Sequence, residues 1–112
     1  MFKFFRSFFL LFIFTASSAF AIGDAFDQAA FDRLLKEGKP VLIAVHADWC
    51  STCRAQEIFL KDLLKTPPYN DLHVLRVDFD RQKEAVRAFK VRMQSTLIVF
   101  KNGNEVGRST AD

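Results

Sequence analysis

The chain has only two cysteines, and they lie in one short stretch, Cys50-Ser51-Thr52-Cys53. The apolar run Val41–Val45 comes shortly before them, and a segment compatible with a helix follows. A helix N-terminus offers unpaired N–H groups and roughly half a positive charge, which favours a thiolate over a thiol. A strand that delivers a cysteine pair to the first turn of a helix therefore predicts a reactive thiol and redox chemistry.

The first 21 residues have the three parts of a secretory signal peptide. Basic Lys3 and Arg6 precede an apolar run at 8–14, and the small residues Ala19 and Ala21 form an Ala-x-Ala cleavage site. The alternative is a membrane anchor, but this run is far shorter than the ~20 apolar residues that span a bilayer. We expect cleavage after Ala21 and a periplasmic or secreted protein, which would touch the membrane only through the uncleaved signal peptide.

The remaining part, residues 22–112, has the size of one small domain with a modest core. Loss of Lys3 and Arg6 lowers the formal net charge from +3 to +1 and leaves no basic stripe, so we expect no nucleic-acid partner. Two cysteines that close so small a loop do not form a disulfide scaffold. The expected organisation is a signal peptide over 1–21 and one folded domain over 22–112.

Apolar spacing and turn residues divide this domain into alternating helices and strands. Helices are expected over 24–36, from Cys50 or Ser51 to just before Pro67, and over 81–90; strands are expected over 41–47, 72–79, 96–100 and 105–109. Gly38 and Pro40 should end the first helix, and Asn102-Gly103 should form the turn of a closing hairpin. The apolar positions of the later helices are Ile58, Phe59, Leu63 and Leu64 in the second, and Ala85, Ala88 and Phe89 in the third.

Strands that are separated by helices predict parallel crossovers, and the closing hairpin adds antiparallel strands. The expected fold class is therefore α/β, with a small mixed sheet and flanking helices.

Three stretches, in this order, resemble the thioredoxin family. They are Ala47-Asp48-Trp49-Cys50-x-x-Cys53, Val77–Asp80 and Thr96–Gly103, and the likeness runs from about Phe26 to Arg108. The resemblance implies a thioredoxin-like fold and a thiol:disulfide oxidoreductase that acts on protein thiols and disulfides. It assigns Cys50 as the exposed nucleophile and Cys53 as the buried resolving thiol, with no cofactor beyond this redox-active pair.

Among exported members, the chain is similar to the periplasmic C-terminal domain of DsbD-type thiol:disulfide reductases. The signal peptide, the sequence Ala47–Cys50 and Glu57 carry this likeness, which implies a membrane electron donor as a partner. Glu57 lies one helical turn beyond Cys53, where a carboxylate would raise the thiol pKa and could relay its proton. The alternative is an ordinary ion pair between Glu57 and Lys61.

Several positions depart from the family's pattern. Ser51-Thr52 replaces a Gly-Pro dipeptide, and this leaves open whether the pair acts as a reductant or as an oxidant. Ala44 stands where the family often has a buried aspartate, and Arg76 replaces the lysine that partners that aspartate. The internal proton acceptor for Cys53 would then be Glu57, His46 or water.

Two further departures lie beside the cysteine pair. His46 replaces an aromatic residue, and it could be a packed strand residue or, like Trp49, a residue that modulates the site. Ser95 occupies the position of the family's cis-proline, and we expect a trans bond because a cis bond before serine would cost about 3 kcal/mol. By resemblance, Ser95 and Thr96 belong to the substrate-binding loop.

Two other functions fit the same residues. Soft thiolates bind Cu(I) or zinc, so Cys50 and Cys53 with His46 could form a metal carrier; an inactive interaction module of the same fold is the third reading. The family's last helix has no counterpart before Asp112, so we expect one face of the sheet to be half covered. Truncation of the sequence is our preferred explanation for this missing helix.

Overall fold

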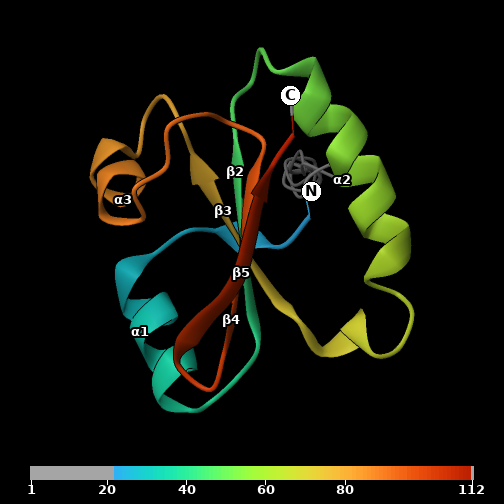
Figure 1. Ribbon diagram of the computed structural model, residues 1–112, viewed down its shortest axis with the longest axis vertical. Helices are drawn as coiled ribbons and strands as arrows, with labels where there is room; N and C mark the ends of the chain where they lie inside the picture. The colour runs from blue at the N-terminus through green and yellow to red at the C-terminus, as the bar shows by residue number, and fades with distance from the viewer. Residues whose placement is uncertain (1–21, 112) are drawn as a thin grey trace, which may run out of the picture.

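The computed structural model describes residues 22–111, so the predicted signal peptide lies outside the described part (Figure 1). No helix within residues 22–111 is long and apolar enough to cross a membrane. The elements follow one another as β1 (Asp24–Ala25), α1 (Gln28–Lys36), β2 (Val41–His46), α2 (Ser51–Leu63), the 3-10 turn η2 (Tyr69–Asp71), β3 (His73–Asp78), α3 (Lys83–Ala88), β4 (Thr96–Lys101) and β5 (Asn104–Thr110).

The strands form one mixed sheet in the order β1-β3-β2-β4-β5. The central strand β2 runs parallel to β3 and antiparallel to β4, and β4 and β5 form the closing hairpin. Asn102 and Gly103 both have positive φ angles, 52° and 83°, as the tight turn between these strands requires. The predicted α/β fold with parallel crossovers and a closing hairpin is confirmed.

The central strand is buried on both faces, as its apolar run predicts. Val41, Ile43 and Val45 are at most 1% exposed and pack in the core beneath α1 and α3. Leu42 and Ala44 point to the opposite face, which α2 covers (Figure 1). Because β2 is enclosed in this way, its carboxyl end and the residues that follow are held in a fixed position.

The α1 and α3 face of the sheet has a well-filled core. Four phenylalanine rings from different parts of the chain pack against one another, with centroids 5.1 to 6.0 Å apart and mostly tilted or edge-on. These rings belong to Phe26, Phe31, Phe89 and Phe100.

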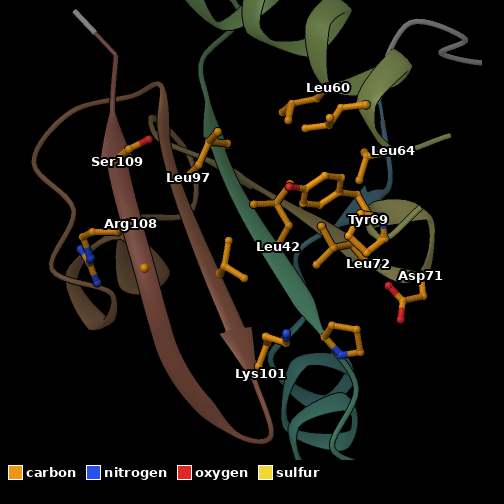
Figure 2. Close-up of a pocket in the computed structure, with 15 residues that line it drawn as sticks. Leu42, Leu60, Leu64, Tyr69, Asp71, Leu72, Leu97, Lys101, Arg108 and Ser109 are labelled. Atoms are coloured by element: carbon orange, nitrogen blue, oxygen red, sulfur yellow. The ribbon is translucent and has the colours of Figure 1, made fainter. Parts of the chain in front are cut away.

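The α2 face is less completely covered. Between α2, η2 and the strands lies an open apolar groove of about 590 Å³. Figure 2 shows Leu60 of α2 and Leu64, the C-cap of that helix, above it, Leu42 and Leu97 of the sheet along its floor, and Leu72 on its η2 side. The prediction of a half-covered sheet face is confirmed.

The predicted start of the first helix was wrong. The helix begins at Gln28, because the side chain of Asp27 accepts a hydrogen bond from the backbone N–H of Ala30 at 3.0 Å and caps the first turn. Asp24 and Ala25 form a short strand that pairs with β3. This pairing depends on a distant segment, so local apolar spacing could not reveal it. Gly38 ends the helix as predicted, since its N–H donates to the carbonyl of Leu35.

Some apolar helix positions do not face the core. Ile58 and Phe59 are 68% and 62% exposed, and Leu60 is the buried residue of that turn. In α3, Ala88 is exposed and Val86 is buried in its place. Both helices have apolar side chains on more than one face, so their spacing alone does not fix which face packs against the sheet.

The approach of Gly23 to β3 gives a test of this packing. Gly23 has a φ of +69°, and a Cβ at this position would overlap the backbone carbonyl of Val74. We expect Gly23→Ala to lower the free energy of unfolding, measured in urea, by about 1–3 kcal/mol. Gly107→Ala is the matched control, because nothing lies within 4 Å of its added Cβ. Equal stability of the two variants would contradict the packing described for β1.

Candidate active site

The junction between β2 and α2 places the cysteine pair. After β2 the chain turns, with the N–H of Cys50 donating to the carbonyl of Ala47 at 3.1 Å. Cys50 is the N-cap of α2, and its Sγ accepts a hydrogen bond from the backbone N–H of Cys53 at 3.0 Å. The predicted position of the pair at the first turn of a helix is confirmed, and a helix N–H points at the Cys50 sulfur.

Cys50 and Cys53 form a disulfide, with their Cα atoms 5.3 Å apart. The expectation of an exposed Cys50 beside a buried Cys53 does not hold in this oxidised form, because the two residues are 4% and 3% exposed. Ala47 and Phe79 pack in one cluster with the pair.

The Ser95 hydroxyl lies beside the disulfide and contacts both of its sulfur atoms. Its Oγ is 3.3 Å from Cys50 Sγ and 3.2 Å from Cys53 Sγ, and the residue is 1% exposed. The one cis peptide bond among residues 22–111 joins Pro67 and Pro68, so the trans bond predicted before Ser95 is confirmed. Sequence reasoning placed Ser95 in this loop but did not anticipate that its side chain contacts both sulfurs.

The backbone of Ser95 is held by three hydrogen bonds. Its N–H donates to the Val45 carbonyl at 2.9 Å, and its carbonyl accepts from the N–H of Ala111 at 3.1 Å and from Nε2 of Gln56 at 3.3 Å. Thr96 is also buried, and its hydroxyl donates to the Met93 carbonyl at 2.7 Å. Neither Ser95 nor Thr96 therefore presents a free surface to a substrate.

Trp49 is the exposed aromatic residue next to the pair. The residue is 60% exposed, and its Nε1 donates a hydrogen bond to Oδ2 of Asp80 at 2.8 Å. This bond joins the turn before α2 to the turn after β3. Trp49, which directly precedes Cys50, therefore supplies a large exposed apolar surface beside the cysteine pair.

Asp78 organises the turn after β3. One of its carboxylate oxygens accepts from the backbone N–H groups of Asp80 and Arg81, each at 3.0 Å, and the other accepts from the Arg81 guanidinium at 2.9 Å. Burial pushes the pKa of Asp78 upward, but the backbone N–H groups and the charges of Arg81 and His46 outweigh it and hold the pKa below its ordinary value. His46 ends β2 as the register partner of Asp78.

Groups that could exchange protons with Cys53 are few. Ala44 is buried and pairs in register with Arg76, whose Nε is buried without a hydrogen-bond partner. Glu57 is half-buried, and no hydrogen bond joins it to either sulfur among the described residues. The polar side chain in contact with Cys53 Sγ is therefore that of Ser95.

The proposed third metal ligand is not grouped with the cysteines. Within residues 22–111, no three His, Cys, Asp or Glu side chains are gathered so that they could hold one metal ion. His46 is instead the register partner of Asp78, at the end of β2. The metal-carrier alternative gains no support from this arrangement.

A cysteine pair at a strand–helix junction of a mixed α/β sheet defines a thiol–disulfide exchange protein. The family model named Thioredoxin matches residues 24–112. The chain is 37% identical over 82 residues to the thioredoxin of Mycobacterium bovis, which covers 73% of this chain and 70% of that protein. The chain belongs to the thioredoxin family and is a thiol:disulfide oxidoreductase.

Solved structures agree with this assignment. The crystal structure of Trxlp from Edwardsiella tarda EIB202 superposes with a TM-score of 0.75 at 46% identity, over 78% of this chain and 84% of that one. The thioredoxin of Fasciola hepatica superposes with a TM-score of 0.68 at 25% identity, over 80% of this chain and 86% of that one.

Sequence reasoning missed two residues that shape the site. Asp80 has no signal of its own beyond its place in the stretch Val77–Asp80, and its bond to Trp49 joins residues 31 positions apart. Gln56 had a weak signal, because it lies on the helix three residues after Cys53, yet its bond to Ser95 spans 39 positions. Both contacts join distant segments that the fold brings together near the carboxyl ends of β2 and β3.

The lowered pKa of Asp78 predicts how stability depends on pH. A carboxyl group whose pKa is lower in the folded chain stabilises it above the unfolded pKa of about 3.9, and this stabilisation is lost as the pH falls through the folded value. We expect Asp78→Asn to reduce the free energy of unfolding by about 1 kcal/mol at pH 7, through loss of the charged contact with Arg81. The difference should vanish at acidic pH in urea titrations. Asp62→Asn, on the exposed part of α2, is the control; a deficit for Asp78→Asn that stays constant with pH would contradict the assignment.

Proposed function

We propose that the chain carries out thiol–disulfide exchange in the cell envelope, with Cys50 as the nucleophile and Cys53 as the resolving thiol. The supporting observation is the 3.0 Å hydrogen bond from the Cys53 N–H to Cys50 Sγ at the first turn of α2. A helix N–H directed at one sulfur stabilises negative charge there after reduction. Cys53 belongs to the helix itself and is buried, as suits an internal second thiol.

The exchange conserves bonds, electrons and protons. The Cys50 thiolate attacks a protein disulfide, forms a mixed disulfide, and releases one substrate sulfur as a thiolate. Cys53 then loses its proton and attacks Cys50 Sγ, which restores the Cys50–Cys53 bond and releases the second substrate sulfur. Two electrons have passed to the substrate, so a donor dithiol must reduce the pair again before the next turnover.

The envelope location is supported by the sequence of residues 1–21, with its basic start, apolar run and Ala-x-Ala end. The first described strand begins at Asp24, so cleavage after Ala21 would leave every described element intact. The likeness to the periplasmic domain of DsbD-type reductases favours reduction of exported proteins, with a membrane protein as the electron donor.

The roles of the two cysteines can be tested by trapping. In Cys53→Ser, the mixed disulfide between Cys50 and a substrate cannot be resolved, so a covalent adduct on Cys50 should accumulate. Mass spectrometry of the purified variant after incubation with an unfolded, disulfide-containing protein would identify it. Cys50→Ser is the matched control and should trap much less.

The opposite trapping pattern, with adducts mainly on Cys53, would reverse the two roles. Absence of adducts from both variants would argue against exchange. The reduction potential then gives the direction, since a value near the −270 mV typical of thioredoxin indicates a reductant and one near about −120 mV an oxidant.

Export predicts a defined mature N-terminus. We expect the protein recovered from the cell envelope to begin at Ile22, as measured by its intact mass. Ala19→Arg should leave an uncleaved precursor, because cleavage requires small residues at this position. A full-length chain beginning at Met1 in the cytoplasmic fraction of the wild type would refute the proposed location.

A further inference from the structure

We propose that Ser95 is a positioning residue of the reduced pair, whose hydroxyl donates a hydrogen bond to the Cys50 thiolate and accepts one from the Cys53 thiol. The proposal rests on the exchange function proposed above and names the group that sets the protonation of its two thiols. It starts from the position of the Ser95 Oγ, which is almost equidistant from both sulfurs.

The hydroxyl is held in place from several directions. The Ser95 N–H is bound to the carbonyl of Val45 on β2, and its carbonyl accepts from Gln56 on α2 and from the N–H of Ala111 beyond β5. The residue is 1% exposed, so water does not compete freely for its side chain. Its backbone has a φ of +67°, which is uncommon for a residue other than glycine. Two elements, β2 and α2, and the segment after β5 thus hold this residue against the pair.

The proton count fixes what this hydroxyl does in each redox state. A serine hydroxyl has one proton to donate and two lone pairs that accept. In the disulfide neither sulfur carries a proton, so Ser95 is the donor in any hydrogen bond that it makes with them. It can donate to only one of the two at a time.

Reduction changes which groups can donate a hydrogen bond at the pair. A donor dithiol gives two electrons to the Cys50–Cys53 bond and becomes a disulfide itself. One of its two protons remains on Cys53 and the other is released, because Cys50 stays a thiolate beside the helix N-terminus. The Cys53 thiol then donates to Ser95 Oγ, and the Ser95 hydroxyl donates to the Cys50 thiolate. Hydrogen bonds in such a chain polarise one another, so each strengthens the other.

Other residues do not compete for this role. Ala44 has no side-chain donor or acceptor, and Glu57 has no hydrogen bond to the pair among the described residues. The Val45 carbonyl is 3.9 Å from Cys53 Sγ, farther than Ser95 Oγ at 3.2 Å, and it already accepts the Ser95 N–H. The hydroxyl is therefore the better placed acceptor for the Cys53 proton.

The hydrogen bond favours the reduced form. A bond to a charged acceptor is stronger than a bond to a neutral sulfur, so Ser95 stabilises the Cys50 thiolate more than it stabilises the disulfide. Removal of the hydroxyl should raise the pKa of Cys50 and shift the equilibrium toward the disulfide, which makes the pair a stronger reductant.

The test compares Ser95→Ala and Ser95→Gly with the wild type. Both substitutions remove Oγ, and glycine also suits the φ of +67°. The rate of iodoacetamide alkylation of Cys50 in the reduced protein is followed against pH by mass spectrometry. We expect the apparent pKa of Cys50 to rise by about one to two units in both variants, as the loss of a charge-assisted hydrogen bond predicts. The equilibrium constant for reduction by glutathione at pH 8 should fall about tenfold or more.

Thr110→Val is the matched control for a merely structural effect. It removes a hydroxyl on β5 that lies 3.0 Å from the Thr96 Oγ1 and makes no hydrogen bond to sulfur among the described residues. We expect it to keep the wild-type Cys50 pKa and equilibrium constant. Cooperative urea unfolding of each variant verifies that it is folded.

An unchanged Cys50 pKa in both Ser95 variants, or an equal shift in Thr110→Val, would overturn the proposal. The alkylation titration requires no substrate, so its outcome is independent of turnover. If the Ser95 variants shift the pKa while the cysteine variants trap no substrate, the exchange function fails and the role of Ser95 stands. If the cysteine variants trap substrate while the Ser95 variants leave the Cys50 pKa unchanged, the exchange function stands and Ser95 has no part in it.

Discussion

The active site depends on how the central strand ends. β2 is buried on both faces, and at its carboxyl end the carbonyl of Val45 accepts the N–H of Ser95. One residue later β2 ends at His46, and a short turn leads to Cys50, the N-cap of α2. This backbone hydrogen bond ties the loop before β4 to the strand that leads to the cysteines, and it helps to hold the Ser95 hydroxyl against both sulfurs.

This arrangement also explains why the two faces of the sheet need not be equally filled. The phenylalanine cluster and the aliphatic side chains beneath α1 and α3 form the continuous core. The α2 face has fewer buried residues and an open apolar groove lined in part by Leu42 and Leu97. Because Val41, Ile43 and Val45 anchor β2 from the opposite face, the position of Cys50 does not require the groove to be filled.

Most of the fold could be predicted from the sequence because its signals are local. The alternation of strands and helices, the Asn102-Gly103 turn and the start of the second helix at Cys50 or Ser51 depend on nearby residues, and all are confirmed. β1 could not be predicted, because two residues become a strand only through pairing with β3. The inward faces of α2 and α3 were also misjudged at Phe59 and Ala88, since apolar side chains there occupy more than one face.

The same distinction between local and distant contacts decides how much of the active site could be predicted. The cysteine pair and its place on a helix follow from adjacent residues, whereas the contacts of Ser95 with Gln56 and with both sulfurs join segments that are 39 to 45 residues apart. The family resemblance located Ser95 beside the pair but described it through the proline that it replaces. The chemistry of the position follows from the hydroxyl, which proline does not have.

A hydroxyl and a carboxylate beside a resolving thiol affect the titration of that thiol differently. A buried carboxylate gains or loses its own proton as the pH changes, so the charge near the thiols changes with it and the two titrations become coupled. The side chain of Ala44 cannot ionise, and a serine hydroxyl does not ionise in the range where thiols titrate. With Ser95 in contact with both sulfurs, proton exchange at the pair adds no second charge to the site. The pH dependence of exchange should then reflect the two thiols themselves, without the coupled titration that a carboxylate at the position of Ala44 would introduce.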